Sequence, residues 1–422
     1  MKLLGQMNNY IRSLICFALL IVVALNLTAC STSVQADDLA KNITANNVKG
    51  KETDEKFVNN TANFSIELFK KSFIDNKSTL ISPLSVLIAL SMTANGAEGE
   101  TLTQMEKVLG GDIPIDQLNE YLYTYSNSLP SEKKSKLNIA NSIWFRDNKD
   151  SLTVEKEFLQ KNSDYYKAAA YKSVFDKQTV KDINNWVRKN TDNMIDSIID
   201  DIDDETVMFL INAVVFDARW ENVYMKNDIH KGNFTSIDKS VQNVDFMRSN
   251  ESKYIKDSKA TGFIKPYANG KYSFVALLPN EGTDIKDYVA TLTGESFLDI
   301  IKPSEQTQVN AYLPKFTYDY SIKLNDVLKA LGMPKPFSSD AEFSKLGKSN
   351  GGNIFISDVL HKTFISVDEL GTKAGAAIKV EMTKSAATPA EKTVKLDRPF
   401  VYAIIDNETN LPVFVGTVMS IK

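Results

Sequence analysis

The chain has 422 residues, 43% of them hydrophobic, which is enough to bury a large core in one big domain or two ordinary ones. Its 49 Lys and Arg residues are mixed with 53 Asp and Glu residues, giving a formal net charge of −4. Proteins that bind nucleic acid usually carry a basic face, and no basic stretch indicates one here. The composition therefore indicates a globular protein and excludes nucleic acid as an expected partner.

The first thirty residues have the pattern of an export signal. A positively charged start precedes an apolar run at 14–27, and small residues lead from this run to Cys30. The ending Leu-Thr-Ala-Cys resembles a bacterial lipobox, in which cleavage before the cysteine leaves it lipid-modified at the new N-terminus. We therefore expect residues 1–29 to be a lipoprotein signal peptide, and Cys30 to carry a lipid that anchors the protein to a membrane.

Only one cysteine would remain after this cleavage, because Cys16 lies in the removed segment. No disulfide can then form within the chain, so packing must hold the fold together. The stretch at 30–56 is polar, and we interpret it as a tether between the lipid and a folded body at 57–422. The expected location is the bacterial cell surface, on the outer membrane or the outer face of the cell membrane, or the periplasm.

The N-terminal third of the body carries helix signals. Apolar residues at helical spacing predict a first helix from about Phe57. A Ser-Pro start and an Asn-Gly end predict a second helix within 82–96. A sequence that fits a capping box predicts a third helix within 101–111. This part of the chain is therefore expected to be mainly helical.

Helix and strand signals mix farther along the chain. Patterns near 180–199 and at 322–331 predict helices, and the apolar run VMFLINAVVF at 207–216 predicts a strand buried on both faces. An Asn-Gly pair at 269–270 predicts a hairpin between two apolar segments, and the segment 398–421 reads as a second hairpin. Without an internal repeat or linker in the body, we expect one mixed domain.

No catalytic motif has the context that its chemistry needs. Residues 347–351 match G-x-S-x-G, but a nucleophile elbow requires a buried strand before Ser349 and a helix after it. This segment is polar and Gly-rich and is better read as a turn. The only candidate bases are His230 and His361, and two histidines without a usable cysteine predict no zinc site. We expect no metal, no cofactor and no enzymatic activity.

The stretch GTKAGAAIKVEMTKSAATPAEKT at 371–393 changes character in its middle. From Thr372 to Met382 every second residue is small or apolar, which is the period of a half-buried strand. From Ser385 onward the residues are small and polar without periodicity, as in a surface loop. The pattern predicts a strand that runs directly into an exposed loop.

Six segments, in chain order, resemble the serpins, a family of serine protease inhibitors. They are ISPLSVLIALSMTANGAEGET (81–101), NSIWF (141–145), LINAVVFDARW (210–220), LPKF (313–316), HKTFISVDELGTKAGAA (361–377) and DRPFVYAI (397–404). The resemblance covers nearly all of 57–422. It implies an α+β fold with about three β-sheets, eight to nine helices and an exposed reactive-centre loop at about 370–394.

The resemblance also implies a mechanism for the loop. In an inhibitory serpin a protease cleaves the loop, whose N-terminal part then inserts as a strand into the main sheet and distorts the covalently attached protease. The alternation at 372–382 is the pattern that such a strand needs. Burial of Ile378, Val380 and Met382 would contribute roughly 1.5–3 kcal/mol each. The intact chain would therefore be metastable, held by a kinetic barrier.

The resemblance assigns roles to particular residues. The hinge of the loop comprises Glu369, Gly371, Thr372, Ala374, Gly375, Ala376 and Ala377. A polar cluster where the main sheet opens comprises Ser82, Ser85, Asn212 and His361. At the point of loop entry it implies Trp220 and a charge pair of Lys315 with Glu369. Three residues depart from the family pattern, namely Leu370, Lys373 and Ile378.

Two adjacent bonds are candidates for the scissile bond. The usual family spacing from Glu369 leads to Ser385-Ala386, whereas Lys384-Ser385 offers a basic residue to a trypsin-like protease. We expect cleavage after Lys384. Because the stretch is longer than in many members, Met382, Thr383 and Thr388 stay open as sites for other proteases.

The implied partners are trypsin-like, elastase-like or subtilisin-like serine proteases, with papain-like cysteine proteases as a further class. The membrane is a second expected partner through the lipid at Cys30, and the protein is expected to be a monomer. An alternative is a non-inhibitory serpin-fold binding protein whose loop is only a substrate. A third hypothesis is a hydrolase that uses Ser349.

Overall fold

A computed structural model of the chain describes residues 34–129, 131–132, 135–147, 152–268, 270–302, 307–350, 352–372 and 392–421. Within these ranges the protein has nine α-helices: α2 (Glu55–Ser72), α3 (Pro83–Ala94), α4 (Gly99–Leu109), α5 (Ile115–Ser128), α6 (Lys156–Tyr166), α7 (Lys177–Asn190), α8 (Ile285–Thr291), α9 (Gly294–Ile301) and α10 (Asn325–Leu331). The same ranges also contain two short 3₁₀ helices, η1 (Lys226–Asp228) and η2 (Lys335–Phe337).

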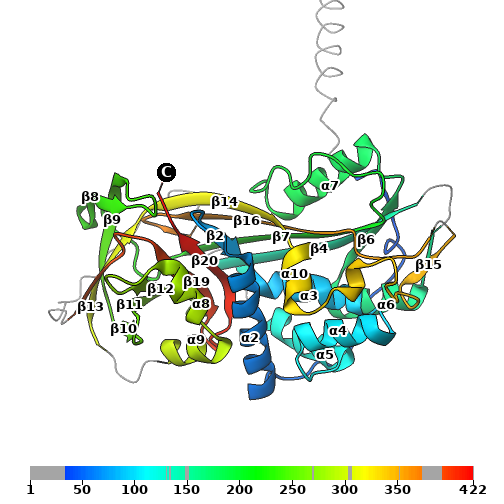
Figure 1. The fold of residues 1–422 in the computed structure, drawn as a ribbon, viewed down its shortest axis with the longest axis horizontal. Coiled ribbons are helices and arrows are strands. Elements are labelled where there is room, and N and C mark those ends of the chain that lie inside the picture. The colour runs from blue at the N-terminus through cyan, green and yellow to red at the C-terminus, as the bar shows by residue number, and fades with distance from the viewer. Residues whose placement is uncertain are drawn as a thin grey trace, which may run out of the picture.

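The main sheet has eight strands and extends across the length of the molecule (Figure 1). Its path runs β1-β6-β4-β7-β17-β16-β14, with β3 paired to β4. The strands are β1 (Asp37–Asp38), β3 (Ser131–Glu132), β4 (Ser135–Arg146), β6 (Ala169–Ser173), β7 (Met208–Arg219), β14 (Phe316–Lys323), β16 (Asp358–Val367) and β17 (Gly371–Thr372).

A second sheet has six strands in the order β10-β11-β12-β19-β20-β2. They are β10 (Lys253–Lys256), β11 (Ala260–Pro266), β12 (Tyr272–Pro279), β19 (Phe400–Asp406), β20 (Pro412–Val418) and β2 (Thr79–Ile81). A third sheet, in the order β18-β13-β9-β8, comprises β18 (Lys392–Lys395), β13 (Val309–Pro314), β9 (Val241–Glu251) and β8 (Ile229–Thr235). A two-stranded sheet pairs β5 (Leu152–Val154) with β15 (Gly347–Ser349).

The apolar core lies where β7 meets the second sheet and α3. Phe216 of β7 packs edge-on against Tyr272 of β12 and Phe414 of β20. All twelve residues of α3 are buried, as expected of a helix that is apolar around its whole circumference. In the ranges described above, no helix combines the length and the apolar character that would let it cross a bilayer.

Several predicted elements are confirmed. Helix α3 follows Ser82 with proline at its first position and ends before Asn95. The predicted buried strand is β7, whose first nine residues are all buried. It lies between β4 and β16, and its two faces pack into two different apolar clusters, so a continuous apolar run is needed. The two predicted hairpins are β11–β12 and β19–β20.

The predicted start of the third helix was wrong. Helix α4 begins at Gly99, because the carboxylate of Glu342 accepts the N–H of Glu100 at 2.9 Å and so caps the helix from a distant part of the chain. The hydroxyl of Thr101 accepts the N–H of Glu342 at 2.8 Å and does not cap its own helix. The prediction of a helix in this region was therefore right, but its N-terminus is capped by Glu342 and not by a capping box at Thr101.

Three other boundaries differ from the prediction. Helix α7 ends at Asn190, because Asn184 binds the chain at Ile198 and Ile199 in a non-helical path. Helix α10 begins only at Asn325, since the preceding residues form β14. The segment predicted as a turn contains the short strand β15, which includes Ser349.

The N-terminal segment from Val34 lies against the body and differs from a free tether. Asp182 of α7, whose side chain is buried, accepts the N–H groups of Gln35 and Ala36 at 2.9 and 2.8 Å. Strand β1 pairs with β6, and the N–H of Asn46 donates to Asp164 at 2.7 Å. The tether interpretation for 30–56 therefore does not hold from Val34 onward, and the expected signal peptide and Cys30 lie outside the described residues.

Candidate functional site

At one end of the main sheet, β17 separates β7 from β16. Thr372 pairs antiparallel with Ala218 of β7 and with Val367 of β16. Beyond this point β7 and β16 pair directly with each other, in parallel, from the pair Asp358–Phe209 to the pair Thr363–Val214. Gly371 and Thr372 of the predicted hinge therefore lie between the two strands at this end of the sheet, and β7 and β16 pair directly along the rest of their length.

A tight turn reverses the chain between β16 and β17. The N–H of Asp368 donates to the carbonyl of Gly371 at 2.9 Å, and the Asp368 carboxylate accepts the N–H groups of Leu370 and Gly371 at 2.8 and 3.2 Å. A Cβ atom on Gly371 would lie 2.1 Å from the carbonyl oxygen of Ala218, so only glycine fits without a shift of the backbone. The turn thus directs Gly371 and Thr372 into antiparallel pairing with β7.

The side chain of Thr372, in the predicted hinge, is enclosed by aromatic rings. Thr372 is 1% exposed, and its hydroxyl lies 2.5 Å from the hydroxyl of Tyr267. Tyr267 stacks on Trp220 with 4.6 Å between ring centroids. The indole N–H of Trp220 donates to the carbonyl of Asp368 at 2.9 Å. Trp220 therefore contacts the turn directly through its side chain.

Lys315 and Glu369 form the ion pair implied by the resemblance, with 2.5 Å between Lys315 Nζ and Glu369 Oε2. The hydrogen bond from Lys315 lowers the pKa of the Glu369 carboxyl. Because the two side chains are 29% and 38% exposed, the pair contributes at most about 1 kcal/mol. Its effect is mainly to hold the outer side of the turn.

The polar cluster crosses three strands in register. Asn212 of β7 lies opposite His361 of β16, and on its other side it lies opposite Asn141 of β4. The Nε2 atom of His361 accepts the N–H of Ser82 at 3.2 Å, so Nδ1 carries the hydrogen and donates to Asn212 Oδ1. The same oxygen accepts the hydroxyl of Ser85 at 2.9 Å. All four predicted members of the cluster are therefore in contact.

Burial lowers the pKa of His361 to about 3, so the ring is neutral at ordinary pH. Both of its nitrogens are occupied by the cluster, so His361 is not a free base for the hydrolase hypothesis. His230, the other candidate base, lies exposed on β8. In the described part of the chain, no group of three His, Cys, Asp or Glu side chains could hold a metal ion.

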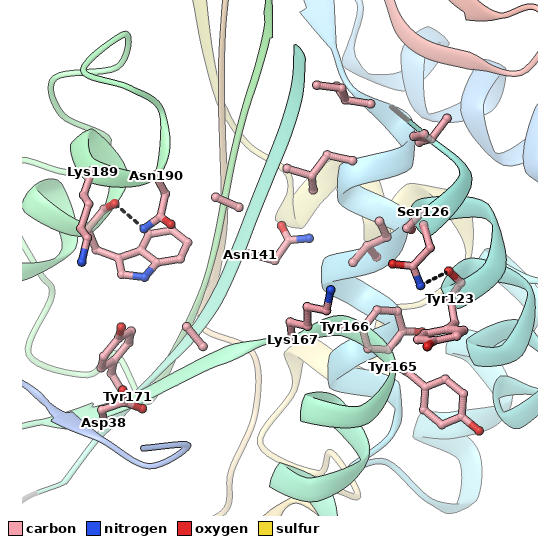
Figure 2. Close-up of a pocket in the computed structure, with 18 of the residues that line it drawn as sticks. Asp38, Tyr123, Ser126, Asn141, Tyr165, Tyr166, Lys167, Tyr171, Lys189 and Asn190 are labelled. Atoms are coloured by element: carbon pink, nitrogen blue, oxygen red, sulfur yellow. Dashed lines mark hydrogen bonds between the residues drawn. The ribbon is translucent and has the colours of Figure 1, made fainter. Parts of the chain in front are cut away.

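Sequence reasoning missed Asn141, which completes the cluster. Its side-chain oxygen accepts the amide of Asn212, and its own amide donates to the carbonyl of Ser85 at 3.3 Å. Asn141 also lines a cavity of about 730 Å³. Figure 2 shows it among the lining residues, together with Tyr166 and Lys167. The motif NSIWF contains this residue, but only the strand register shows that Asn141 faces Asn212.

The remaining predicted site residues fall outside the described ranges. They are Ala374, Gly375, Ala376 and Ala377 of the hinge, and the scissile-bond candidates Lys384, Ser385 and Ala386. Of the hinge, the structure thus describes Glu369, Gly371 and Thr372.

Comparison with known proteins agrees with this fold. A family model described as Serpin (serine protease inhibitor) matches residues 59–421. An uncharacterized serpin-like protein of Thermococcus kodakarensis is 31% identical over 382 residues, which cover 88% of each chain. The native-state crystal structure of tengpin, a thermophilic serpin, matches with a TM-score of 0.88 at 57% identity, covering 92% of this chain and 100% of tengpin.

A second structure of tengpin, in the latent state, matches less closely, with a TM-score of 0.79 at 56% identity over 88% of this chain and 100% of that chain. The predicted α+β serpin fold is confirmed. The chain belongs to the serpin family, whose general activity is the inhibition of proteases.

Proposed function

We propose that this protein inhibits serine endopeptidases as a suicide substrate. A protease would cleave the reactive-centre loop at 370–394, and the N-terminal part of the loop would then insert between β7 and β16 while the protease is still bound as an acyl-enzyme. The observation that supports this proposal is β17, because Thr372 already occupies the first position of the inserted strand.

The inward direction of the Thr372 side chain agrees with the alternation of apolar residues in the sequence that follows it. The Thr372 side chain points into the core, and strand residues two apart share a face. The next inward positions would be Ala374, Ala376 and Ile378, followed by Val380 and Met382. All are apolar, whereas Lys373, Lys379 and Glu381 fall on the other face.

The free energy for trapping would come from this new strand. Before insertion, β7 and β16 share one set of backbone hydrogen bonds; after insertion, the new strand would form one set with β7 and another with β16. Each added hydrogen bond contributes about 0.5–1.5 kcal/mol net. The larger inward side chains add roughly 1.5–3 kcal/mol each. The total is on the order of 10 kcal/mol, which is comparable to the whole stability of many domains.

Separation of β7 from β16 requires the hydrogen bonds of the polar cluster between them to break. His361 and Asn212 face each other across this pair of strands, so their hydrogen bond must break before the strand can pass. The cluster would therefore keep β7 and β16 paired in the intact inhibitor. Once broken, its polar groups would need new partners on the inserted strand.

A lipid anchor at Cys30 is a further part of the proposal. The signal pattern at 1–29 supports export in a bacterium, and the lipid would concentrate the inhibitor at the membrane. Expression of the full chain with a labelled fatty acid tests it. A Cys30→Ala variant is expected to lose the label and leave the membrane fraction; a variant that keeps both would refute the anchor.

The trapping mechanism is tested by mixing protein that lacks residues 1–30 with trypsin, elastase and subtilisin, and with papain as a cysteine protease. We expect a covalent complex that survives denaturing gels, and a released peptide that begins at Ser385 or Ala386. Clean cleavage without a complex would refute trapping and favour the non-inhibitory binding protein. A Lys384→Ala variant that loses only the trypsin complex would identify Lys384-Ser385 as the bond for trypsin.

A further inference from the structure

A buried ion pair lies next to the loop-entry site. Lys265 of β11 and Glu251 at the end of β9 are joined by 2.9 Å between Nζ and Oε1. Their side chains are 1% and 7% exposed. Lysine and glutamate are rarely buried to this degree, because removing each charge from water costs several kcal/mol.

The cation of Lys265 contacts two aromatic rings of the loop-entry site. Its Nζ lies 4.4 Å from the ring centroid of Tyr224 and 5.3 Å from that of Trp220, which is within cation–π range. Burial acts to lower the pKa of Lys265, but Tyr224 and Glu251 raise it and the net direction is upward, so the amine stays charged. Lys265 also donates to the carbonyl of Asn222 at 3.2 Å.

The anionic side of the pair reaches the same ring. Ser249 Oγ lies 2.6 Å from Glu251 Oε1 and 3.2 Å from the hydroxyl of Tyr224. The ring of Tyr224 is therefore held at its face by Lys265 and at its hydroxyl through Ser249.

Trp220 and Tyr224 in turn hold the turn before β17. The indole and backbone N–H groups of Trp220 donate to the carbonyls of Asp368 and Leu370, each at 2.9 Å. The backbone N–H of Tyr224 donates to the carbonyl of Glu369 at 3.0 Å. Three consecutive carbonyls of the turn are thus bound by two residues that the ion pair contacts.

We propose that the Lys265–Glu251 pair is a positioning element for loop insertion: it keeps Trp220 and Tyr224 in the places from which they hold the turn at 368–370. The proposal rests on the proposed trapping function. Fold stability alone does not explain the pair, since apolar residues of similar volume are often equally or more stabilising at buried sites. Without the pair, the turn would be held less firmly and insertion would be slower than hydrolysis of the acyl-enzyme.

The test removes both charges and keeps the volume, in a Lys265→Met/Glu251→Met double variant. A Lys265→Arg variant, which retains a cation, serves as the rescue, and Lys161→Met, which removes a surface cation paired with Asp116, serves as the matched control. Three quantities are measured: hydrogen exchange of the backbone amides at 368–372, the fraction of loop cleavages that give a covalent complex, and the urea midpoint of unfolding.

We expect exchange at 368–372 in the double variant to be about thirtyfold faster, the size of effect that loss of a desolvated cation–π contact produces. The complex fraction should fall severalfold, while the urea midpoint is unchanged or higher; Lys265→Arg should recover part of the loss. Unchanged exchange and an unchanged complex fraction in a folded double variant would overturn the proposal. If the wild type forms no complex, the trapping function fails, and the exchange measurement still decides whether the pair holds the turn.

Discussion

Replacement of Thr372 by arginine tests the central step, entry of the hinge into the main sheet. The Thr372 side chain is 1% exposed, and its one polar contact among the described residues is the hydroxyl of Tyr267. A guanidinium at this position would be buried without a carboxylate, at a cost of several kcal/mol. The chain would avoid this cost by leaving β17.

The magnitude of the effect follows from a competition between insertion and hydrolysis of the acyl-enzyme. A cost of about 3 kcal/mol in the insertion step slows it about 150-fold. Hydrolysis would then overtake trapping in nearly every turnover. Binding and cleavage of the loop should be unaffected, because the scissile bond lies more than ten residues farther along the chain.

The assay titrates trypsin or subtilisin with Thr372→Arg and with Thr372→Ser, and measures the moles of inhibitor needed to abolish one mole of activity. Thr372→Ser keeps the hydroxyl that faces Tyr267 and should behave like the wild type. Thr372→Arg should be cleaved at the same bond without a stable complex. An unchanged stoichiometry for Thr372→Arg would show that this position need not enter the sheet.

Three other outcomes follow from the structure. A Gly371→Ala variant is expected to displace β17, because the new Cβ would lie 2.1 Å from the Ala218 carbonyl, and faster hydrogen exchange at 371–372 checks this; equal exchange would contradict it. The pKa of His361 is about 3 when folded and about 6.5 when unfolded, so folding stability should fall as pH drops from 6.5 toward 3, by up to about 1.4 kcal/mol per unit. Urea unfolding at pH 7 and 4.5 measures this, and a His361→Asn variant with the same pH dependence as the wild type would refute it. An Asp182→Ala variant should release the segment at 34–36, and unaltered protease resistance of this segment would argue against its anchoring by Asp182.

The sequence by itself determined those features that depend on residues close together in the chain. The Ser-Pro start and Asn-Gly end were sufficient for α3, and a continuous apolar run was sufficient to predict β7 as a buried strand. The two hairpins were equally local, since each turn joins strands that are neighbours in sequence. The family segments carried the fold class, and they predict the hinge, including Thr372.

Tertiary structure decided the features that depend on residues far apart in the chain. The cap of α4 comes from Glu342, 242 residues away, and no local pattern at Thr101 shows it. Asn141 joins the polar cluster only because β4 and β7 pair in a register that puts it opposite Asn212. Glu251 stands in a polar stretch and Lys265 in an apolar one, and neither local pattern shows that β9 and β11 bring the two side chains together in the core. Local propensity acts over a few residues, whereas strand register and the pairing of buried charges are set by the packing of the whole chain.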